Sequence, residues 1–260
     1  MSTRPSVLIT GASTGIGAVY AGRFARRGHD LVLVARDRVR MDTLADSLRR
    51  DAGVAVDVLR ADLTDSGELA QVEARLRDDS RIGVLINNAG TSAAGGFLNQ
   101  KPEDTARVIS LNVTAVTRLA RSVAPRFVAA GEGSIVNISS VVALAPQAVA
   151  TVYGATKAFV LFLSQALQFE LGPKGVYVQA VLPAATRTGI WERAGLDVNS
   201  LPAVMDVEEM VDAALVGFDR REAITIPSLP DFEQWTELEA ARHAMIRNVD
   251  QAHAADRYRG

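Results

Sequence analysis

The chain has 260 residues, of which 22% are charged and 48% hydrophobic, and its formal net charge is -2 at pH 7. This composition is typical of a soluble globular enzyme, and it excludes the strongly basic field of a nucleic-acid-binding protein. The absence of cysteine excludes disulfides and thiolate metal sites, and the three histidines share no helical spacing, so we assign no metal.

The N-terminus consists of a short polar segment followed directly by the apolar run Val7-Leu8-Ile9. No removable signal is visible, and the run is too short to span a bilayer. We therefore expect a cytoplasmic protein that has no membrane partner.

The same run predicts a first strand, and a glycine-rich turn and a helical pattern to about Arg27 follow it. Gly11 permits the tight turn, Gly15 allows the backbone to approach a pyrophosphate, and Gly17 allows the helix to pack closely on the strand. The helix N-terminus favours the negative charge. The spacing G-x-x-x-G-x-G is one residue longer than the fingerprint G-x-G-x-x-G. The expected dinucleotide contacts are Gly11, Ser13, Thr14, Gly15, Ile16 and Gly17.

Three more strands are expected in the first half, at residues 31–34, near 54–59 and at 82–86. Asn87-Asn88-Ala89-Gly90 closes the fourth, at the carboxyl end of the sheet, where doubly wound folds bind ligands. Side-chain amides there can lock neighbouring strands, and Gly90 leaves room for a cofactor. A plain turn is the alternative, because Asn and Gly are common turn formers.

A fifth strand at residues 134–138 leads to Ser140 and then to a helix from about Thr151 to Leu171. Tyr153 and Lys157 are four residues apart on this helix and therefore share a face. A tyrosine titrates near about pH 10, so acid/base work at neutrality needs a nearby cation that favours the phenolate. Ser140 could hold a substrate oxygen while Tyr153 passes a proton to or from it. Taken alone, this spacing more often indicates a snorkelling lysine beside a half-buried ring.

Two segments predict where a substrate would lie. Residues 141–150 contain almost nothing polar except Gln147, which we expect to contact a largely apolar substrate. After a sixth strand at residues 176–182, the segment at about 189–205 places apolar side chains among charges. It is consistent with a mobile lid that presents Trp191 to the substrate, or with the edge of a core helix.

Helices and strands alternate along the chain to a short seventh strand at residues 223–226, and the strands are apolar on both faces. This pattern predicts one α/β domain at residues 1–228, a Rossmann-type doubly wound parallel sheet of about seven strands flanked by helices. Residues 229–260 are expected to form a helical C-terminal extension of that domain, through about Tyr258. Its apolar residues recur at the spacing of a helix that docks on the body or on a partner subunit. They are Trp235, Leu238, Ala241, Met245 and Val249.

From residue 5 to about residue 190, the order of the motifs resembles the short-chain dehydrogenase/reductase family. The matching residues are Thr10-Gly11-x-x-x-Gly15-x-Gly17, Asn87 to Gly90, Asn112, Ser140, and Tyr153 with Lys157. The resemblance implies hydride transfer between a nicotinamide and the carbonyl or secondary alcohol of a small molecule. It implies that Tyr153 is the general acid/base, and that Lys157 lowers the pKa of Tyr153 and contacts the nicotinamide ribose. It also implies that Ser140 polarises the substrate oxygen and that Asn112 supports a proton relay; Ser139 is one residue off the family spacing.

The cofactor preference follows from the end of the second strand. The residue aligned with the family's NAD-selecting acid is Arg36, which would pair with a 2′-phosphate, so NADP(H) is the expected cofactor. NAD(H) is the alternative, because Asp37 follows immediately and Thr14 is not the basic residue found in many NADP-preferring relatives.

Three further contacts are implied by the same resemblance. Asp62 with Leu63 matches the adenine-contacting position, although Asp62 could instead cap a helix. Asn88, Ala89 and Gly90 border the cofactor. Thr188 matches the threonine that reaches the nicotinamide carboxamide, but Ala184 replaces the family's usual glycine. A positive φ at that alanine would cost about 1 kcal/mol or more.

The helix that carries Tyr153 is apolar nearly all round, and relatives commonly pair through it, so we expect a homodimer or homotetramer. A non-catalytic dinucleotide sensor or interaction protein on the same fold is the alternative function. Isomerase or dehydratase chemistry is a lesser one, because a fold does not fix the reaction.

Overall fold

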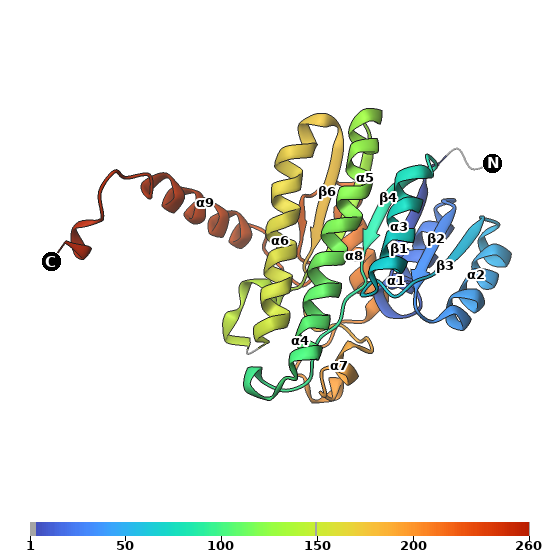
Figure 1. Ribbon diagram of the computed structural model, residues 1–260, viewed down its shortest axis with the longest axis horizontal. Helices are drawn as coiled ribbons and strands as arrows, with labels where there is room; N and C mark the ends of the chain where they lie inside the picture. Colours follow the sequence, from blue (N-terminus) through green and yellow to red (C-terminus); the bar gives the residue numbers. More distant parts are fainter. Residues whose placement is uncertain (1–3, 149, 260) are drawn as a thin grey trace. The chain divides into compact units, whose positions relative to one another are not determined.

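The computed structural model describes residues 4–148 and 150–259. A seven-stranded parallel sheet in the order β3-β2-β1-β4-β5-β6-β7 forms its centre (Figure 1). The strands are β1 Ser6–Thr10, β2 Leu31–Ala35, β3 Val56–Arg60, β4 Ile82–Asn87, β5 Gly133–Ile138, β6 Val176–Val181 and β7 Ile224–Thr225. This sheet, with helices along both faces, confirms the expected Rossmann-type doubly wound fold.

Both faces of the sheet are buried because successive side chains of a strand point to opposite faces. Val7 and Ile9 of β1 belong to one apolar core, and Leu8 belongs to the other. The first core is covered by α1 Gly15–Arg26, α2 Arg38–Ala52 and α8 Val207–Asp219. The second is covered by α3 Ser66–Asp78, α5 Val116–Ala130 and the end of α6 Thr151–Leu171.

The adjacent strands β1 and β4 mark the point where the strand order reverses, and a crevice forms there beyond their carboxyl ends. Side-chain amides connect the strand ends at this place, as the sequence predicted. Nδ2 of Asn87 donates to Oδ1 of Asn137 at 2.9 Å, which links β4 to β5. Nδ2 of Asn88 donates to the Thr10 carbonyl at 2.9 Å, which links β4 to β1. The floor of the crevice is thereby held by hydrogen bonds as well as by the sheet.

Two helical segments interrupt the regular alternation. α4 Pro102–Ile109 continues into a π-helical turn at Ser110–Ala115 before α5 begins. α7 Ile190–Arg193 is a single turn inside the segment expected to form a lid. None of the helices in the described part of the chain combines the length and apolar character needed to cross a bilayer.

Residues Ser228–Gly260 form a separate compact unit. Its helix, α9 Glu233–Asn248, ends well before the expected boundary near Tyr258. Val249 and Asp250 follow, and both residue types have weak helix propensity. Of the apolar stripe, Trp235 is buried, whereas Leu238 and Met245 are exposed.

Candidate active site

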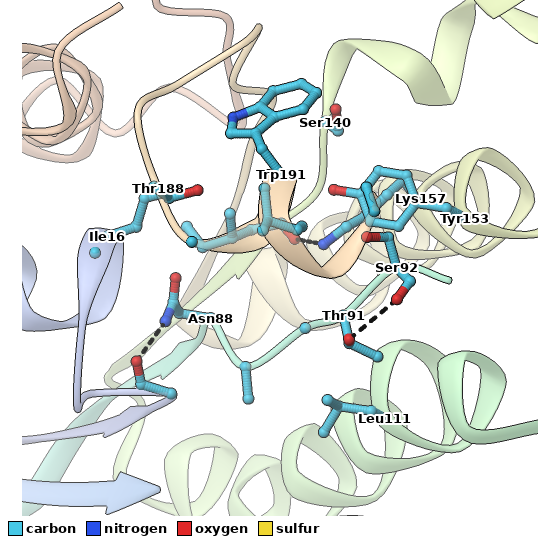
Figure 2. A pocket seen from close by; sticks show the side chains of 18 of the residues that line it. Ile16, Asn88, Thr91, Ser92, Leu111, Ser140, Tyr153, Lys157, Thr188 and Trp191 are labelled. Atoms are coloured by element: carbon cyan, nitrogen blue, oxygen red, sulfur yellow. Dashed lines mark hydrogen bonds between the residues drawn. The ribbon is translucent and has the colours of Figure 1, made fainter. Parts of the chain in front are cut away.

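One cavity of about 1220 Å³ is lined by the segments that follow the carboxyl ends of the strands. The residues singled out from the sequence that line it are Gly11, Ser13, Thr14, Gly15, Ile16, Arg36, Asp62, Leu63, Asn88, Ala89, Gly90, Ser140, Tyr153, Lys157, Thr188 and Trp191. Gly17, Asn112 and Gln147 are not among the lining residues. Figure 2 shows Ser140, Tyr153 and Lys157 on one side of the cavity, and Ile16 and Thr188 on the other.

The three glycines of the first turn have different tasks. Gly11 and Gly15 have φ values of +66° and +56°, which only glycine adopts without strain. A Cβ on Gly17 would collide with the carbonyl oxygen of Gly11 and with Asn88, so Gly17 permits a close contact behind the turn rather than at the cavity. A Cβ on Gly15 would lie 3.3 Å from Cγ2 of Thr188, so Gly15 keeps the gap between these two segments open.

The N-terminus of α1 has the features of an anion site. Asp37, Asp65 and Asp206 cap α2, α3 and α8 through side-chain hydrogen bonds. Thr14, at the N-cap of α1, makes no such bond, and the first turn of α1 contains no acidic residue. Gly15 and Ile16 of this turn line the cavity, so the backbone N–H groups at the start of α1 are candidate donors to a dinucleotide pyrophosphate.

The position of Asp37 bears on the cofactor. Asp37 lines the cavity, but Oδ1 accepts a hydrogen bond from the Arg40 backbone N–H at 3.0 Å, and Oδ2 lies 3.3 Å from Arg40 Nε. The carboxylate is thus committed to capping α2. Arg36, one residue earlier and directly after β2, also lines the cavity, whereas Arg40 is paired with Asp37.

Asp62 does not cap a helix. Its Oδ1 accepts from the backbone N–H of Thr64 at 2.9 Å and from the Thr64 hydroxyl at 2.7 Å, while Asp65 caps α3. Burial raises the pKa of Asp62, but the bonds from Thr64 and the guanidinium groups of Arg36 and Arg107 outweigh burial, and the pKa lies below its usual value. Asp62 is a carboxylate at neutral pH.

Tyr153 and Lys157 face each other across one turn of α6. Nζ of Lys157 lies 5.6 Å from the centre of the Tyr153 ring and donates to the Ile138 carbonyl at 2.8 Å. Lys157 is 5% exposed, and burial lowers its pKa to about 8. An ammonium held this close favours a phenolate over a phenol.

The two neighbouring serines are in different environments. Ser139 is buried, and its hydroxyl donates to the Lys157 carbonyl at 2.7 Å. Ser140 is half-buried, and its hydroxyl is 3.3 Å from both the Pro183 carbonyl and the Val142 backbone N–H. Such long bonds are weak, so the Ser140 hydroxyl can turn to a ligand, whereas Ser139 is engaged.

Asn112 lies behind the cavity wall, in the π-helical turn. Its Nδ2 donates to the Thr91 carbonyl at 2.9 Å and to the Thr156 hydroxyl at 3.0 Å, and its Oδ1 accepts from the Thr91 backbone N–H at 2.9 Å. The Thr156 hydroxyl in turn donates to the Tyr153 carbonyl at 2.7 Å. The side chain of Asn112 therefore connects the segment after β4 to the turn that carries Tyr153, and Thr156 is a link that the sequence analysis missed.

At the substrate end, the structure places one expected contact elsewhere. Trp191 lines the cavity, and its Nε1 donates to the Thr186 carbonyl at 2.7 Å. Gln147 is exposed and does not line the cavity, whereas its neighbour Ala148 does. Both lie on the 3₁₀ turn Pro146–Ala148, where successive side chains point about 120° apart.

The backbone near Thr188 is unstrained. Arg221 is the one non-glycine residue with positive φ in the described part of the chain, so Ala184 has an ordinary conformation. The cost considered for an alanine at this position does not arise, and Thr188 lies beside Gly15 at the cavity.

Replacing Lys157 by methionine is expected to flatten the pH dependence of stability. The pKa of Lys157 is about 8 in the folded protein against an ordinary value of 10.5, so between these values the unfolded chain holds the extra proton and stability rises with pH. From pH 7.5 to 9.5 the free energy of unfolding of the unchanged protein should rise by about 2 kcal/mol relative to Lys157→Met. Urea unfolding at several pH values measures this difference. Lys174→Met, at an exposed lysine, is the control, and parallel profiles for Lys157→Met and the unchanged protein would contradict the prediction.

Comparisons with known proteins agree with this geometry. The family model described as short chain dehydrogenase matches residues 5–199. Among curated proteins, the chain is 32% identical to human 17-beta-hydroxysteroid dehydrogenase type 3, over 81% of this chain and 68% of that protein. It is 36% identical to very-long-chain 3-oxoacyl-CoA reductase-A of Danio rerio, over 68% of this chain and 56% of that protein. The chain thus spans little more than half the length of that reductase.

Two solved structures match nearly the whole chain. A short-chain dehydrogenase from Sphingobium yanoikuyae in complex with NADPH is 65% identical, with a TM-score of 0.97 over 98% of this chain and 99% of that one. A bulky-bulky ketone specific alcohol dehydrogenase from Comamonas testosteroni is 60% identical, with a TM-score of 0.92 over 98% of each chain.

Proposed function

Since the chain belongs to the short-chain dehydrogenase family, we propose that it is an NADP(H)-dependent oxidoreductase whose substrates are ketones with large groups on both sides of the carbonyl, or the matching alcohols. The observation that carries this proposal is the single cavity that connects Arg36 and the glycine turn with Ser140, Tyr153 and Lys157. Such a cavity has room for a dinucleotide along its length and for a reacting group at its far end.

The preference for NADP(H) is supported by charge. Arg36 faces the adenosine end of the cavity, and the nearby carboxylate of Asp37 is engaged at the start of α2. A guanidinium pairs well with the 2′-phosphate of NADPH, whereas the ribose hydroxyls of NADH are better hydrogen-bonded by a carboxylate. The 65% identical neighbour in complex with NADPH supports the same cofactor.

The proposed acid/base chemistry uses three side chains. In the direction of reduction, the hydroxyls of Ser140 and Tyr153 donate hydrogen bonds to the carbonyl oxygen of the substrate, and Tyr153 gives its proton to that oxygen as negative charge develops. The ammonium of Lys157 stabilises the phenolate that remains. The nicotinamide, when bound, supplies the hydride to the carbonyl carbon or accepts it in the reverse direction. Asn112 and Thr156 act on this group by fixing the turn that carries Tyr153.

The proposed substrate class is supported by the walls at the far end of the cavity. Small side chains from separate segments line it, which leaves room for large substituents. These residues are Ala93, Gly95, Gly96, Ala148, Ala150 and Ala194. Trp191, Leu196 and Leu201 of the proposed lid, at about residues 189–205, add apolar surface. The 60% identical alcohol dehydrogenase specific for bulky-bulky ketones supports the same class.

The experiment is a fluorescence titration with NADPH and with NADH at one salt concentration, followed by NADPH oxidation with diaryl ketones and with acetone. The proposal expects tighter binding of NADPH and turnover of the diaryl ketones in preference to acetone. Binding without turnover of any ketone or aldehyde would favour a dinucleotide sensor. Absence of binding of either dinucleotide would contradict the proposal.

We also propose that the protein is cytoplasmic. Residues 1–228 would form the catalytic domain, and residues 229–260 its C-terminal extension. We further propose that the protein forms a homodimer or homotetramer. Phe159, Phe162 and Phe169 on α6 are 39%, 67% and 73% exposed, and a second copy of this helix would cover them. Light scattering at micromolar concentration tests the assembly, and a monomeric mass would contradict it.

A further inference from the structure

Arg107 is a charged residue of the cavity to which none of the motifs gives a role. It lies on α4 and lines the cavity, and its Nη2 is 3.5 Å from Oδ2 of Asp62. Arg36, which follows β2, places Nη1 at 3.7 Å from the same oxygen. Two guanidinium groups from segments far apart in the sequence therefore approach one carboxylate oxygen.

The two oxygens of Asp62 are used differently. Oδ1 accepts two hydrogen bonds from Thr64, at 2.9 and 2.7 Å. The guanidinium groups of Arg36 and Arg107 lie beyond the 2.7 to 2.9 Å, roughly, of a charge-assisted hydrogen bond to Oδ2. Oδ2 can therefore accept a short hydrogen bond from a ligand donor that enters between the arginines.

The surroundings of Arg107 suit a flat aromatic ring. Leu111, four residues further along the helical segment, also lines the cavity (Figure 2). Residues four apart share a helix face, so an apolar side chain and a guanidinium lie on one face. A guanidinium is planar and weakly hydrated, and it stacks on aromatic faces. The side chain of Arg107 is 47% exposed, so it can move onto a ring without leaving a buried cavity behind.

We propose that Arg107 covers one face of the cofactor's adenine ring, next to Asp62, which the family resemblance already places at the adenine. This inference rests on the proposed function, because it requires a dinucleotide in the cavity. It gives Arg107 a different task from Arg36. Adenine is common to NADPH and NADH, whereas the 2′-phosphate that Arg36 would meet is present in NADPH alone.

The test compares the dissociation constants of NADPH and NADH for Arg107→Ala with those of the unchanged protein, by fluorescence titration. Both dinucleotides should bind about five- to tenfold more weakly, and the ratio of the two constants should stay the same. Arg107→Lys keeps the positive charge but not the planar guanidinium, so it should recover only a small part of the lost affinity. Arg38→Ala is the matched control, because Arg38 pairs with Asp42 at 2.9 Å and is not among the cavity-lining residues.

Three results would overturn this inference while leaving the proposed function intact. Unchanged binding of both dinucleotides by Arg107→Ala would mean that Arg107 does not touch the cofactor. A loss confined to NADPH would place Arg107 on the 2′-phosphate. Full recovery in Arg107→Lys would show that charge, not a planar contact, is responsible. If the unchanged protein bound neither dinucleotide, both this inference and the proposed function would fail. Equal thermal unfolding of the variants checks that each is folded.

Discussion

Replacing Tyr153 by phenylalanine is expected to lower kcat for ketone reduction by about a thousandfold or more. Phenylalanine keeps the ring beside Lys157, where the ammonium lies 5.6 Å from its centre, but removes the hydroxyl that would transfer the proton. General acid/base groups contribute about 10² to 10⁴ in rate, and the carbonyl oxygen would also lose a hydrogen bond in the transition state. The rate of NADPH oxidation with a diaryl ketone measures the effect.

Two controls separate this loss from misfolding. The affinity for NADPH should change little, because the variant alters the reacting end of the cavity and leaves the glycine turn and Arg36 in place. Tyr177→Phe makes the same chemical change outside the cavity, where the tyrosine hydroxyl donates to the Glu222 carbonyl at 2.8 Å. Turnover of Tyr153→Phe at a near wild-type rate would remove Tyr153 from the proposed acid/base role.

Replacing Arg36 by alanine is expected to weaken NADPH binding by about a hundredfold and to change NADH binding by about twofold at most. A guanidinium makes charge-assisted hydrogen bonds to a phosphate, each worth about 1.5 to 3 kcal/mol, and about 1.4 kcal/mol corresponds to a tenfold change in affinity. We do not expect Asp37 to bind the ribose hydroxyls of NADH in the variant, because its carboxylate caps α2 by accepting from the Arg40 backbone N–H. Dissociation constants for both dinucleotides measure the selectivity.

The position of this arginine in the fold makes the prediction specific. Arg38→Ala removes an equal charge two residues away, from a side chain that pairs with Asp42 outside the cavity, and should leave both constants nearly unchanged. Equal losses of NADPH and NADH affinity in Arg36→Ala would withdraw the argument for a 2′-phosphate contact. Low salt enlarges the effect, because an exposed charge pair is screened at high ionic strength.

Local signals in the sequence were sufficient for most of the scaffold. The helix Thr151–Leu171 has the predicted bounds, because an unbroken apolar pattern without proline fixes it locally. Gly11 and Gly15 have the positive φ that a tight strand-to-helix turn requires. The helix predicted through about Tyr258 was wrong, because α9 ends at Asn248, before two residues of weak helix propensity, and a separate 3₁₀ turn lies at Asp256–Tyr258.

Predictions about which side chains reach the cavity were less complete. Gln147 lies next to the lining residue Ala148 but is exposed and does not line the cavity, which agrees with the rotation of about 120° between successive side chains of a 3₁₀ turn. Asn112 belongs to the predicted set, yet its amide is used to hold Thr91 and Thr156. Thr156 and Arg107 carried no signal of their own, since a threonine and an arginine on helices are ordinary residues.

The sequence by itself determined the order of strands and helices, the glycine turn after β1, and the helix face shared by Tyr153 and Lys157. Each of these depends on neighbours within a few residues, through backbone sterics and helical or strand periodicity. Only the tertiary structure decided that Arg36 and Arg107 approach one oxygen of Asp62. The same holds for the two serines that line the cavity: Ser139 donates a short hydrogen bond to the Lys157 carbonyl, whereas the hydrogen bond of Ser140 is long. These relations join segments far apart in the sequence, and the packing of helices on a twisted sheet, rather than any local pattern, sets their distances.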